Sequence, residues 1–584
     1  MKPSMRTPHF TVRLLLLALL TTVLAACSGG LPEKVWLEAP GWSRGVTVGT
    51  TRSGDRVPMA IDSSNQLWLL LLHQGDSDAA ELVGVGESGR INRQAFPDLI
   101  PPTAADPDLT WSEDGLVISW TQSDILFAAV VSQNGQVIRP PEQLSGHRPV
   151  EHYSVVPRPS GEITFWFSGD KDHPGIYAAT MGSSAGPQSI DTSGINPTVL
   201  LDAFGQLHVV WIEMQASEGQ AAILHWNEAD QEALLLAQPN IKSSDVFEGP
   251  FFAMEDGMGY LFYVISIRTG LRAGDVDAMV VSFTLGDPAN AGEPRRLTVP
   301  GGYALDYEIT AEDGLLLGPR APVPPEGHGT AQLTQFALPG SIGPEVPVGL
   351  RARVDFLMNQ NQGQIGLLVM DGGQPTGYQL LTFTSGNSIR PNLALDDAGH
   401  AYMTWKETSD AEELTVYLAG TRPDWIDSFA SITQDDAERM VLQSIFGMAS
   451  GIILTPMVLL WLIAPVIIIM VTSFFRGAEE DWKHPLTWGP ILLGVIAYWF
   501  VKRSMLPAIF EYVPFSAWVP IIPAWLAPVL RMGLPLAGSL LALWIAYRAT
   551  YGQDRNSPTF FILIFGATDG IISMMLYGGL FLGF

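Results

Sequence analysis

Pro197-Thr-Val-Leu-Leu-Asp-Ala-Phe-Gly-Gln-Leu-His-Val-Val-Trp211 reads as an apolar strand, a tight turn and a second apolar strand that ends in tryptophan. Far along the chain, Pro391-Asn-Leu-Ala-Leu-Asp-Asp-Ala-Gly-His-Ala-Tyr-Met-Thr-Trp405 nearly restates it. Eight such copies, several of them degenerate, are centred on the turn residues Asn65, Gly115, Gly161, Gly205, Gly257, Gly314, Gly363 and Gly399. These turn residues follow one another at intervals of 36 to 57 residues. Self-similarity of this kind predicts a repeat architecture.

The interval and the composition of the copies favour a β-propeller. One four-stranded blade needs about 40–50 residues, and second hairpins occur where a blade requires them, as around Asn134-Gly135. We therefore predict an all-β propeller of seven or eight blades over residues 35–425, with no long helix before residue 430. The last copy lacks a fourth strand, so a strand such as Gly45–Thr50 is expected to close the ring by pairing with it. An array of β-sandwiches is the structural alternative.

A second domain of different character follows residue 440. Ser450–Phe475 holds 26 residues without a charge, enough to cross a bilayer core of about 30 Å. Proline-rich Phe510–Leu530 suits a further span, a re-entrant segment or an interfacial hairpin. We predict a transmembrane domain over 446–584 with four or five helices, preceded by a linker helix over 426–445 that runs into the first span. The other candidate spans are Pro485–Val501, Met532–Tyr547 and Pro558–Phe584.

The N-terminus has the layout of a secretory signal. Basic residues precede the apolar run Leu14–Leu20, and Leu24-Ala25-Ala26-Cys27 follows it, ending in the single cysteine of the chain. This segment resembles the signal peptide of bacterial lipoproteins. The resemblance implies removal of residues 1–26, lipidation of Cys27 and a tether over 27–34. Together with the spans, it predicts a protein of the bacterial cytoplasmic membrane, both lipid-anchored and multi-pass, with the propeller outside. The distribution of Lys and Arg favours four spans over five.

Composition excludes several functions. The formal net charge is −27, and the acids concentrate between residues 28 and 440, which disfavours nucleic acid as a partner. No phosphate-cradling glycine loop is visible, and the ten histidines show no zinc spacing. Asp170-Lys-Asp-His173 and Asp396-Asp-Ala-Gly-His400 lack the spacing of a calcium loop. We therefore expect neither a metal nor a cofactor, and we interpret the acidic turns as caps of tight turns.

One short segment invites a catalytic interpretation. Arg56-Val57-Pro58 is similar to the Arg-Ile-Pro start of sialidases, which are six-bladed propellers. That resemblance implies a site with three arginines, an acid and a Tyr–Glu pair. The match is incomplete, because Ser112-Glu113-Asp114-Gly115 is one residue short of the sialidase Asp-box and the turns at Asp202 and Asp397 lack its serine.

The last predicted span contains an acid, Asp569. A carboxylate at that depth is costly unless it is paired or wetted, so Asp569 is an intramembrane site candidate, with Arg531 or Glu511 to approach it. The small residues Gly566, Ala567 and Gly570 favour close helix packing instead. Taken together, the sequence favours a binding or scaffolding module for a protein or glycan over an enzyme. A transporter or signalling component that uses Asp569 is the alternative, and a sialidase-like glycoside hydrolase is the second alternative.

Overall fold

The chain forms two compact units, each described here by itself. One comprises Leu37–Phe356 with Asn361–Ser431, and the other contains Ile432–Phe584. The computed structural model describes residues 39–582 apart from 40, 74–79, 87, 96–98, 171, 216–218, 256, 301–322, 324–329, 341–344, 357–359, 383–386, 409–412, 430–433, 477–487, 506–508, 510–512, 515–524 and 551–556. The predicted signal peptide, Cys27 and the tether therefore lie outside the described residues.

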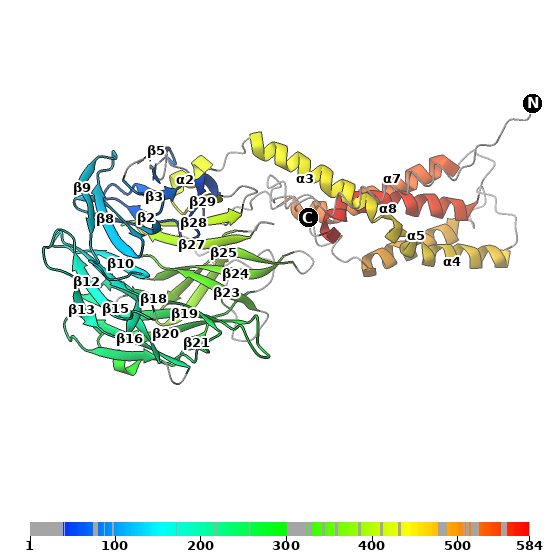
Figure 1. Ribbon diagram of the computed structural model, residues 1–584. Coiled ribbons are helices and arrows are strands. Elements are labelled where there is room, and N and C mark those ends of the chain that lie inside the picture. The colour runs from blue at the N-terminus through cyan, green and yellow to red at the C-terminus, as the bar shows by residue number, and fades with distance from the viewer. Residues whose placement is uncertain are drawn as a thin grey trace, which may run out of the picture. The chain divides into compact units, whose positions relative to one another are not determined.

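Seven antiparallel sheets make up the first unit, which is a seven-bladed β-propeller (Figure 1). Blade 1 comprises β2 (Met59–Ile61), β3 (Leu67–Leu72), β4 (Ala80–Val85) and β5 (Ile91–Ala95), and blade 2 comprises β6 (Ala105–Ser112), β7 (Gly115–Gln122), β8 (Ile125–Val131) and β9 (Val137–Gln143). Blade 3 comprises β10 (His152–Pro157), β11 (Ile163–Ser168), β12 (Ile176–Thr180) and β13 (Gln188–Asp191). Blade 4 comprises β14 (Gly194–Leu201), β15 (Leu207–Gln215), β16 (Gln220–Asn227) and β17 (Ala233–Ala237).

Blades 5 to 7 complete the ring, and blade 6 has five strands. Blade 5 comprises β18 (Val246–Glu255), β19 (Met258–Ser266), β20 (Val276–Thr284) and β21 (Arg295–Arg296). Blade 6 comprises β22 (Val299–Pro300), β23 (Thr330–Ala337), β24 (Val346–Phe356), β25 (Gln360–Asp371) and β26 (Gln374–Leu380). Blade 7 comprises β27 (Ser388–Leu395), β28 (Ala401–Thr408), β29 (Leu414–Gly420) and β1 (Val46–Thr51). A short 3₁₀ turn, η1 (Pro288–Asn290), lies between β20 and β21.

The ring closes with a strand from the start of the chain, as predicted. β1 pairs antiparallel with β29, in a register that sets Val46 opposite Leu418 and Thr51 opposite Leu414. Val48 is fully buried at this junction. Closure in this way joins segments more than 350 residues apart in sequence, so it stabilises the whole ring rather than one blade.

Apolar contacts between neighbouring blades hold the ring together. Side chains of blades 1 and 2 share one buried cluster, and blades 7 and 1, 2 and 3, 3 and 4, and 4 and 5 share others. The tryptophans that end the repeat copies are buried in second strands: Trp68, Trp120, Trp166, Trp211 and Trp405. Large aromatic side chains contribute much of the burial energy of such interfaces, which accounts for a ring that contains no disulfide.

The expectation that acidic residues cap the repeat turns is confirmed. Asp62 accepts hydrogen bonds from the amides of Ser64 (2.8 Å) and Gln66 (3.0 Å), and its second oxygen accepts one from Trp68 (2.8 Å). Asp202 and Asp396 cap their turns through the same two amide positions. The second oxygen of each faces the side chain six residues on, which is His208 and Tyr402 respectively. These carboxylates are part of the turn structure.

The eight-blade alternative and the β-sandwich alternative are wrong. Gly363 was expected to mark a turn, but it lies within β25, where a β-carbon would collide with the guanidinium of Arg351. Gly314, the other weak copy of this region, lies outside the described residues. The two degenerate copies therefore do not add two blades, and one five-stranded blade occupies the region.

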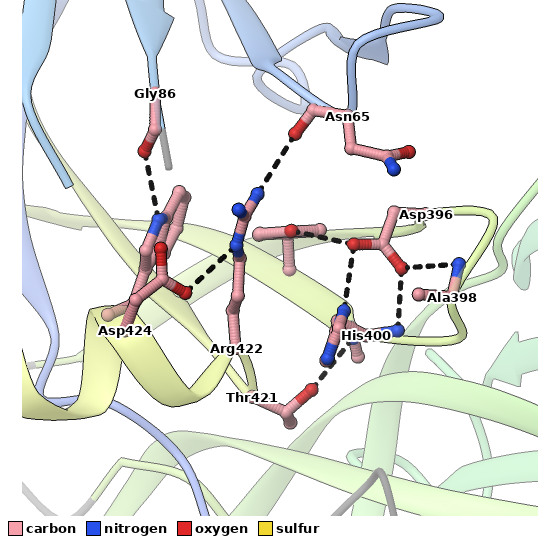
Figure 2. A network of polar contacts seen from close by, with 11 residues as sticks. Asn65, Gly86, Asp396, Ala398, His400, Thr421, Arg422 and Asp424 are labelled. Carbon is pink, nitrogen blue, oxygen red and sulfur yellow. Dashed lines mark hydrogen bonds and ion pairs between the residues drawn. The ribbon is translucent and has the colours of Figure 1, made fainter. Parts of the chain in front are cut away.

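A short helix, α2 (Pro423–Phe429), packs onto the propeller directly after the last blade. Figure 2 shows the polar contacts there: Arg422 donates to the carbonyl of Asn65 in blade 1 and pairs with Asp424, beside the turn that Asp396 caps. Trp425 is buried and donates to the carbonyl of Gly86. The repeat domain, predicted to end at residue 425, is thus followed by a helix that packs on blades 1 and 7.

The second unit is helical. Its helices are α3 (Gln434–Ile453), α4 (Val458–Arg476), α5 (Trp488–Met505), α7 (Ala527–Thr550) and α8 (Pro558–Leu582), with a 3₁₀ turn, η3 (Thr455–Met457), before α4. The linker helix was predicted over 426–445 and continuous with the first span. Instead, α3 ends at Ile453, and the 3₁₀ turn η3 around Pro456 separates it from α4. Proline donates no backbone hydrogen bond and disfavours helix in the residue before it, so the α-helix cannot continue through this position.

Three of the described helices are long and apolar enough to cross a membrane, over Val458–Phe475, Pro528–Thr550 and Pro558–Tyr577. This is fewer than the four or five spans expected. α5 is less apolar and ends in Lys502-Arg503, and most of Phe510–Leu530 is outside the described residues. The close packing expected at Gly566 and Gly570 is confirmed, because a β-carbon at either position would collide with Leu462 or Val458.

Candidate functional site

The innermost strands of the ring share a bulge near their starts. In four blades a residue with positive φ is followed by proline: Asp106-Pro107, Asn196-Pro197, Gly249-Pro250 and Arg390-Pro391. The register of the strand shifts at each of these pairs. Bulges re-aim side chains and often lie next to functional sites. We call this end of the ring, opposite the capped turns, the mouth.

The bulges also connect the blades. The hydroxyl of Thr198 donates to the carbonyl of Pro250 in the next blade (2.7 Å). Asn392 donates in the same way to the carbonyl of Val57 (2.8 Å). Ser154 donates to the carbonyl of Pro197 (2.9 Å). The inner strands are therefore fixed to one another around the mouth, and side chains at their starts sit on a rigid frame.

An arginine cluster occupies one side of the mouth: Arg56, Arg351, Arg353 and Arg390. Arg56 precedes β2 of blade 1, yet it donates to the carbonyl of Phe336 in blade 6 and its guanidinium lies 4.9 Å from the ring centre of Phe251 in blade 5. Its side chain thus reaches across the ring. Burial, together with the charge of Arg390, lowers the pKa of Arg56 to about 10, against the attraction of Glu248.

The other arginines face the same region. Arg351 is half-buried and donates to the carbonyl of Ser388 (2.9 Å), to Thr334 (3.0 Å) and to Asn387 (2.8 Å). Burial and the neighbouring charges of Arg353 and Arg390 lower its pKa, and Glu248 again opposes them. Arg390 donates from Nε to the carbonyl of Gly54 (3.0 Å). Within the described ranges, no residue accepts a hydrogen bond from its two terminal nitrogens.

In the described parts of the chain, these guanidinium groups donate only to neutral acceptors. Among the described residues, Arg56, Arg351 and Arg390 form no ion pair. Half-buried cations that repel one another are costly unless an anion compensates them. The planar fork of arginine matches a carboxylate or sulfate through two parallel hydrogen bonds. The arrangement is therefore suited to binding an anion.

An acidic side faces the mouth from blades 1 to 3: Asp55, Asp106 and Asp108, with His152 and Tyr153. Burial, the charge of Asp55 and a hydrogen bond to the Asp55 carboxyl raise the pKa of Asp106, against the hydroxyl of Thr121 and the charge of His152. Burial raises the pKa of Asp108 to about 6. Burial lowers the pKa of His152, although Glu151, Asp106 and Asp55 oppose this shift. One end of the ring thus carries cations on one side and hydrogen-bond acceptors on the other.

The sialidase resemblance is met only in part. Three arginines converge, as it implied, and Arg56 is one of them. The ring has seven blades instead of six. Among the described residues, Glu248 receives no hydrogen bond from a tyrosine, and the Tyr–Glu pair that does form, Tyr260 with Glu255, lies at the β18–β19 turn, at the end opposite the mouth.

The helical unit contains a separate polar centre at Asp569. Its carboxylate accepts hydrogen bonds from Lys502 (2.7 Å), Tyr498 (2.8 Å) and Ser539, and Lys502 also donates to Ser573 (2.7 Å). Lys502 and Asp569 are both 0 % exposed. Aromatic rings surround the ammonium, including that of Trp499 at 5.4 Å. This centre connects α5, α7 and α8.

The partner of Asp569 is therefore Lys502. Arg531 is exposed on α7 about two turns before Ser539 and makes none of these contacts. Glu511 lies outside the described residues. Lys502 directly follows the predicted span Pro485–Val501, but α5 extends to Met505 and turns this side chain into the bundle while Arg503 stays exposed. The roles of Asp569 and Arg531 in transport or signalling remain predictions.

The mouth itself was missed from sequence, apart from Arg56. A usable signal was present, since a proline stands seven or eight residues before five of the turn residues, at Pro58, Pro107, Pro197, Pro250 and Pro391. No group of three or more metal-ligating side chains was found in the described residues that were searched.

Comparison with known proteins gives fold-level likeness alone. No family model matches the chain, and no curated protein matches it. Among solved structures, a polysaccharide lyase of the PL25 ulvan lyase family shares 11% identity over 65% of this chain and 96% of its own, with a TM-score of 0.43. The polysaccharide lyase Uly1 shares 10% over 63% and 90%, with a TM-score of 0.42. A hydrazine synthase of Kuenenia stuttgartiensis shares 11% over 62% and 99%, with a TM-score of 0.36. The names of these proteins give different activities, and none of them is assigned to this chain.

Proposed function

We propose that the propeller is a membrane-anchored binding module for a carboxylate-bearing glycan, which it holds at the mouth. The observation that carries this proposal is the set of three half-buried guanidinium groups, Arg56, Arg351 and Arg390, whose bound acceptors are all neutral. A carboxylate would supply the missing counter-charge. The terminal nitrogens of Arg390 are free of acceptors in the described part of the mouth and would bind it first.

The acidic side supports a sugar over other carboxylates. A sugar acid presents one carboxylate and several hydroxyl donors, and the carboxyls of Asp55 and Asp106 supply acceptors for those hydroxyls. The ligand binds at the innermost strands, where the end of a glycan chain reaches more readily than a protein surface. The net charge of −27 disfavours long polyanions elsewhere on the surface, so recognition of a terminal acidic sugar fits the charge distribution.

Hydrolysis is a weaker interpretation of the same residues. Paired carboxyls of glycosidases stand about 5–5.5 Å or about 6.5–9.5 Å apart, to admit a nucleophile or a water. Asp55 and Asp106 are close enough to share a hydrogen bond. This pair therefore does not have the separation that glycoside hydrolysis requires.

In this proposal the helical unit and the lipid on Cys27 hold the propeller at the outer face of the bacterial cytoplasmic membrane. The three apolar helices are the support for membrane insertion. In a four-span topology Lys502 would lie at the outer end of α5. Because it is buried in an ion pair with Asp569, it is not counted among the positive charges that flank the spans on the outside. Its removal widens the margin by which the positive-inside rule favours a four-span topology, the fourth span being α5.

Arg390→Met tests the proposal. Full-length protein in detergent is titrated with trigalacturonate, and the variant is expected to bind roughly 10- to 100-fold more weakly, the effect of losing one charge-assisted contact. Arg139→Met is the matched control, since Arg139 pairs with Asp114 in the turn between β6 and β7, at the end of the blade away from the mouth. Equal losses in both variants, or none in Arg390→Met, would contradict an arginine site. Binding of a neutral oligosaccharide with the same affinity would contradict the carboxylate.

A further inference from the structure

Lys406 is a buried cation that forms no ion pair with any carboxylate among the described residues. It lies in β28 of blade 7 and is 0 % exposed. Its ammonium donates to two backbone carbonyls, those of Ser53 (2.8 Å) and Asp55. Both belong to the segment 52–58, which leads from the closing strand β1 into blade 1.

Blade 7 binds this segment at successive carbonyls. Between the two that Lys406 holds, the carbonyl of Gly54 accepts a hydrogen bond from Arg390 (3.0 Å). The carbonyl of Val57 accepts one from Asn392 (2.8 Å). Three side chains of one blade thus fix four carbonyls in the middle of a segment whose ends, Arg52 and Pro58, are hydrogen-bonded to β3 through the backbone. The segment carries Arg56, whose guanidinium crosses the ring.

We infer that Lys406 is the positioning residue of the ligand site: it holds the segment 52–58 in the conformation that delivers Arg56 to the mouth. The inference rests on the proposed function, because it assigns Arg56 to ligand binding. Arg390 then has two functions, since it binds the segment through Nε and binds the ligand through its terminal nitrogens. Lys406 only positions the segment and does not contact the ligand, since it is fully buried.

The electrostatics give this role a pH dependence. Burial lowers the pKa of Lys406 to about 8, and the charge of Arg390 on β27 adds to the shift while Asp55 on the segment opposes it. Above pH 8 the ammonium becomes an amine, and hydrogen bonds from a neutral donor are roughly half as strong. The segment loosens and affinity falls as pH rises through 8.

The free energy of unfolding changes in the opposite direction to the affinity over the same pH range. The unfolded chain keeps its lysine proton up to about pH 10.5, whereas the folded chain releases it near pH 8. The unfolded state therefore binds more protons between these values, and stability rises with pH there. Loss of affinity without loss of stability separates positioning from a merely structural role.

The test uses full-length protein in detergent and trigalacturonate as the probe, from pH 6.5 to 9.5. Wild type is expected to lose about tenfold in affinity between pH 7 and 9, as the charged donor disappears. Lys406→Met should bind at least tenfold more weakly at pH 7 and show no further fall. Lys406→Arg should bind like wild type at pH 7 and keep that affinity at pH 9. Exposed Lys242→Met is the control, with a wild-type profile.

Wild-type affinity in Lys406→Met, or a wild-type fall with pH in Lys406→Arg, overturns the inference. Hydrogen exchange of the amides in 52–58 provides a readout that needs no ligand. Lys406→Met should exchange there at least tenfold faster, with β18 unchanged as the measure of an intact ring. If wild type binds no trigalacturonate, the proposed function fails and the exchange result still decides the role of Lys406: equal protection in both proteins overturns it.

Discussion

Asp108 shows how a single residue departs from the pattern that its neighbours obey. It follows the bulge proline of blade 2, as Asn392 does in blade 7. In each case the side-chain Oδ1 accepts a hydrogen bond from the next backbone amide, at 2.9 Å for Asp108 and 3.1 Å for Asn392. Asn392 also donates to the neighbouring blade. An ionised Asp108 has no proton to donate, and burial raises its pKa to about 6.

We predict that Asp108→Asn stabilises the propeller at neutral pH. The folded wild type holds its proton up to about pH 6, whereas the unfolded chain releases it near 3.8, so wild-type stability falls as pH rises between these values. Above pH 6 the amide should gain about 1–2 kcal/mol. Thermal unfolding at pH 4 and pH 7 checks this: the gain should nearly vanish at pH 4. A gain independent of pH, or an equal gain for the exposed control Asp397→Asn, would argue against it.

At the scale of elements, the helical unit depends on one charge pair. Lys502 on α5 and Asp569 on α8 are both fully buried, and Ser539 connects α7 to them. Every oxygen of the carboxylate has a donor. A fully satisfied network of this kind fixes helix packing, while a lone charge left inside the bundle is strongly unfavourable.

We expect Asp569→Asn to lower the thermal stability of the protein in detergent, by about 3–5 kcal/mol in the helical unit. The double change of Lys502→Met and Asp569→Leu removes both charges, so it should cost less than the single change. Arg531→Met is the exposed control and should behave like wild type. An Asp569→Asn protein of wild-type stability that nonetheless loses ion flux or signalling would favour the transporter or signalling alternative instead.

The same element shows where sequence patterns lose resolution. The apolar stretches of the sequence predicted α4, α5, α7 and α8. The position at which α5 ends, however, determines which of its two terminal cations, Lys502 or Arg503, pairs with Asp569 inside the bundle. Neighbouring helical residues point about 100° apart, so only one of Lys502 and Arg503 can face the bundle. The pattern placed both in a loop because charges usually end a span. Nothing local in sequence identifies Lys502 as the partner of Asp569.

At the scale of the whole molecule, the propeller was largely predictable and its mouth was not. A turn residue and a buried second-strand tryptophan repeat in blades 1, 2, 3, 4 and 7, because each blade must bury the same faces. Closure by the strand after residue 45 followed from a missing fourth strand. The arginine cluster has no such period, since Arg56, Arg351 and Arg390 come from different positions in blades 1, 6 and 7, and the ring alone brings them together.

The central claim is that this end of the ring recognises a carboxylate on a sugar. Its most direct test is calorimetric titration of the full-length protein at pH 7 with trigalacturonate and with its fully methyl-esterified form, which keeps every hydroxyl but has no charge. The account predicts binding of the acid and an affinity for the ester at least tenfold lower, as expected when charge-assisted bonds to arginine are lost. Equal affinity for both, or binding of neither, would contradict it.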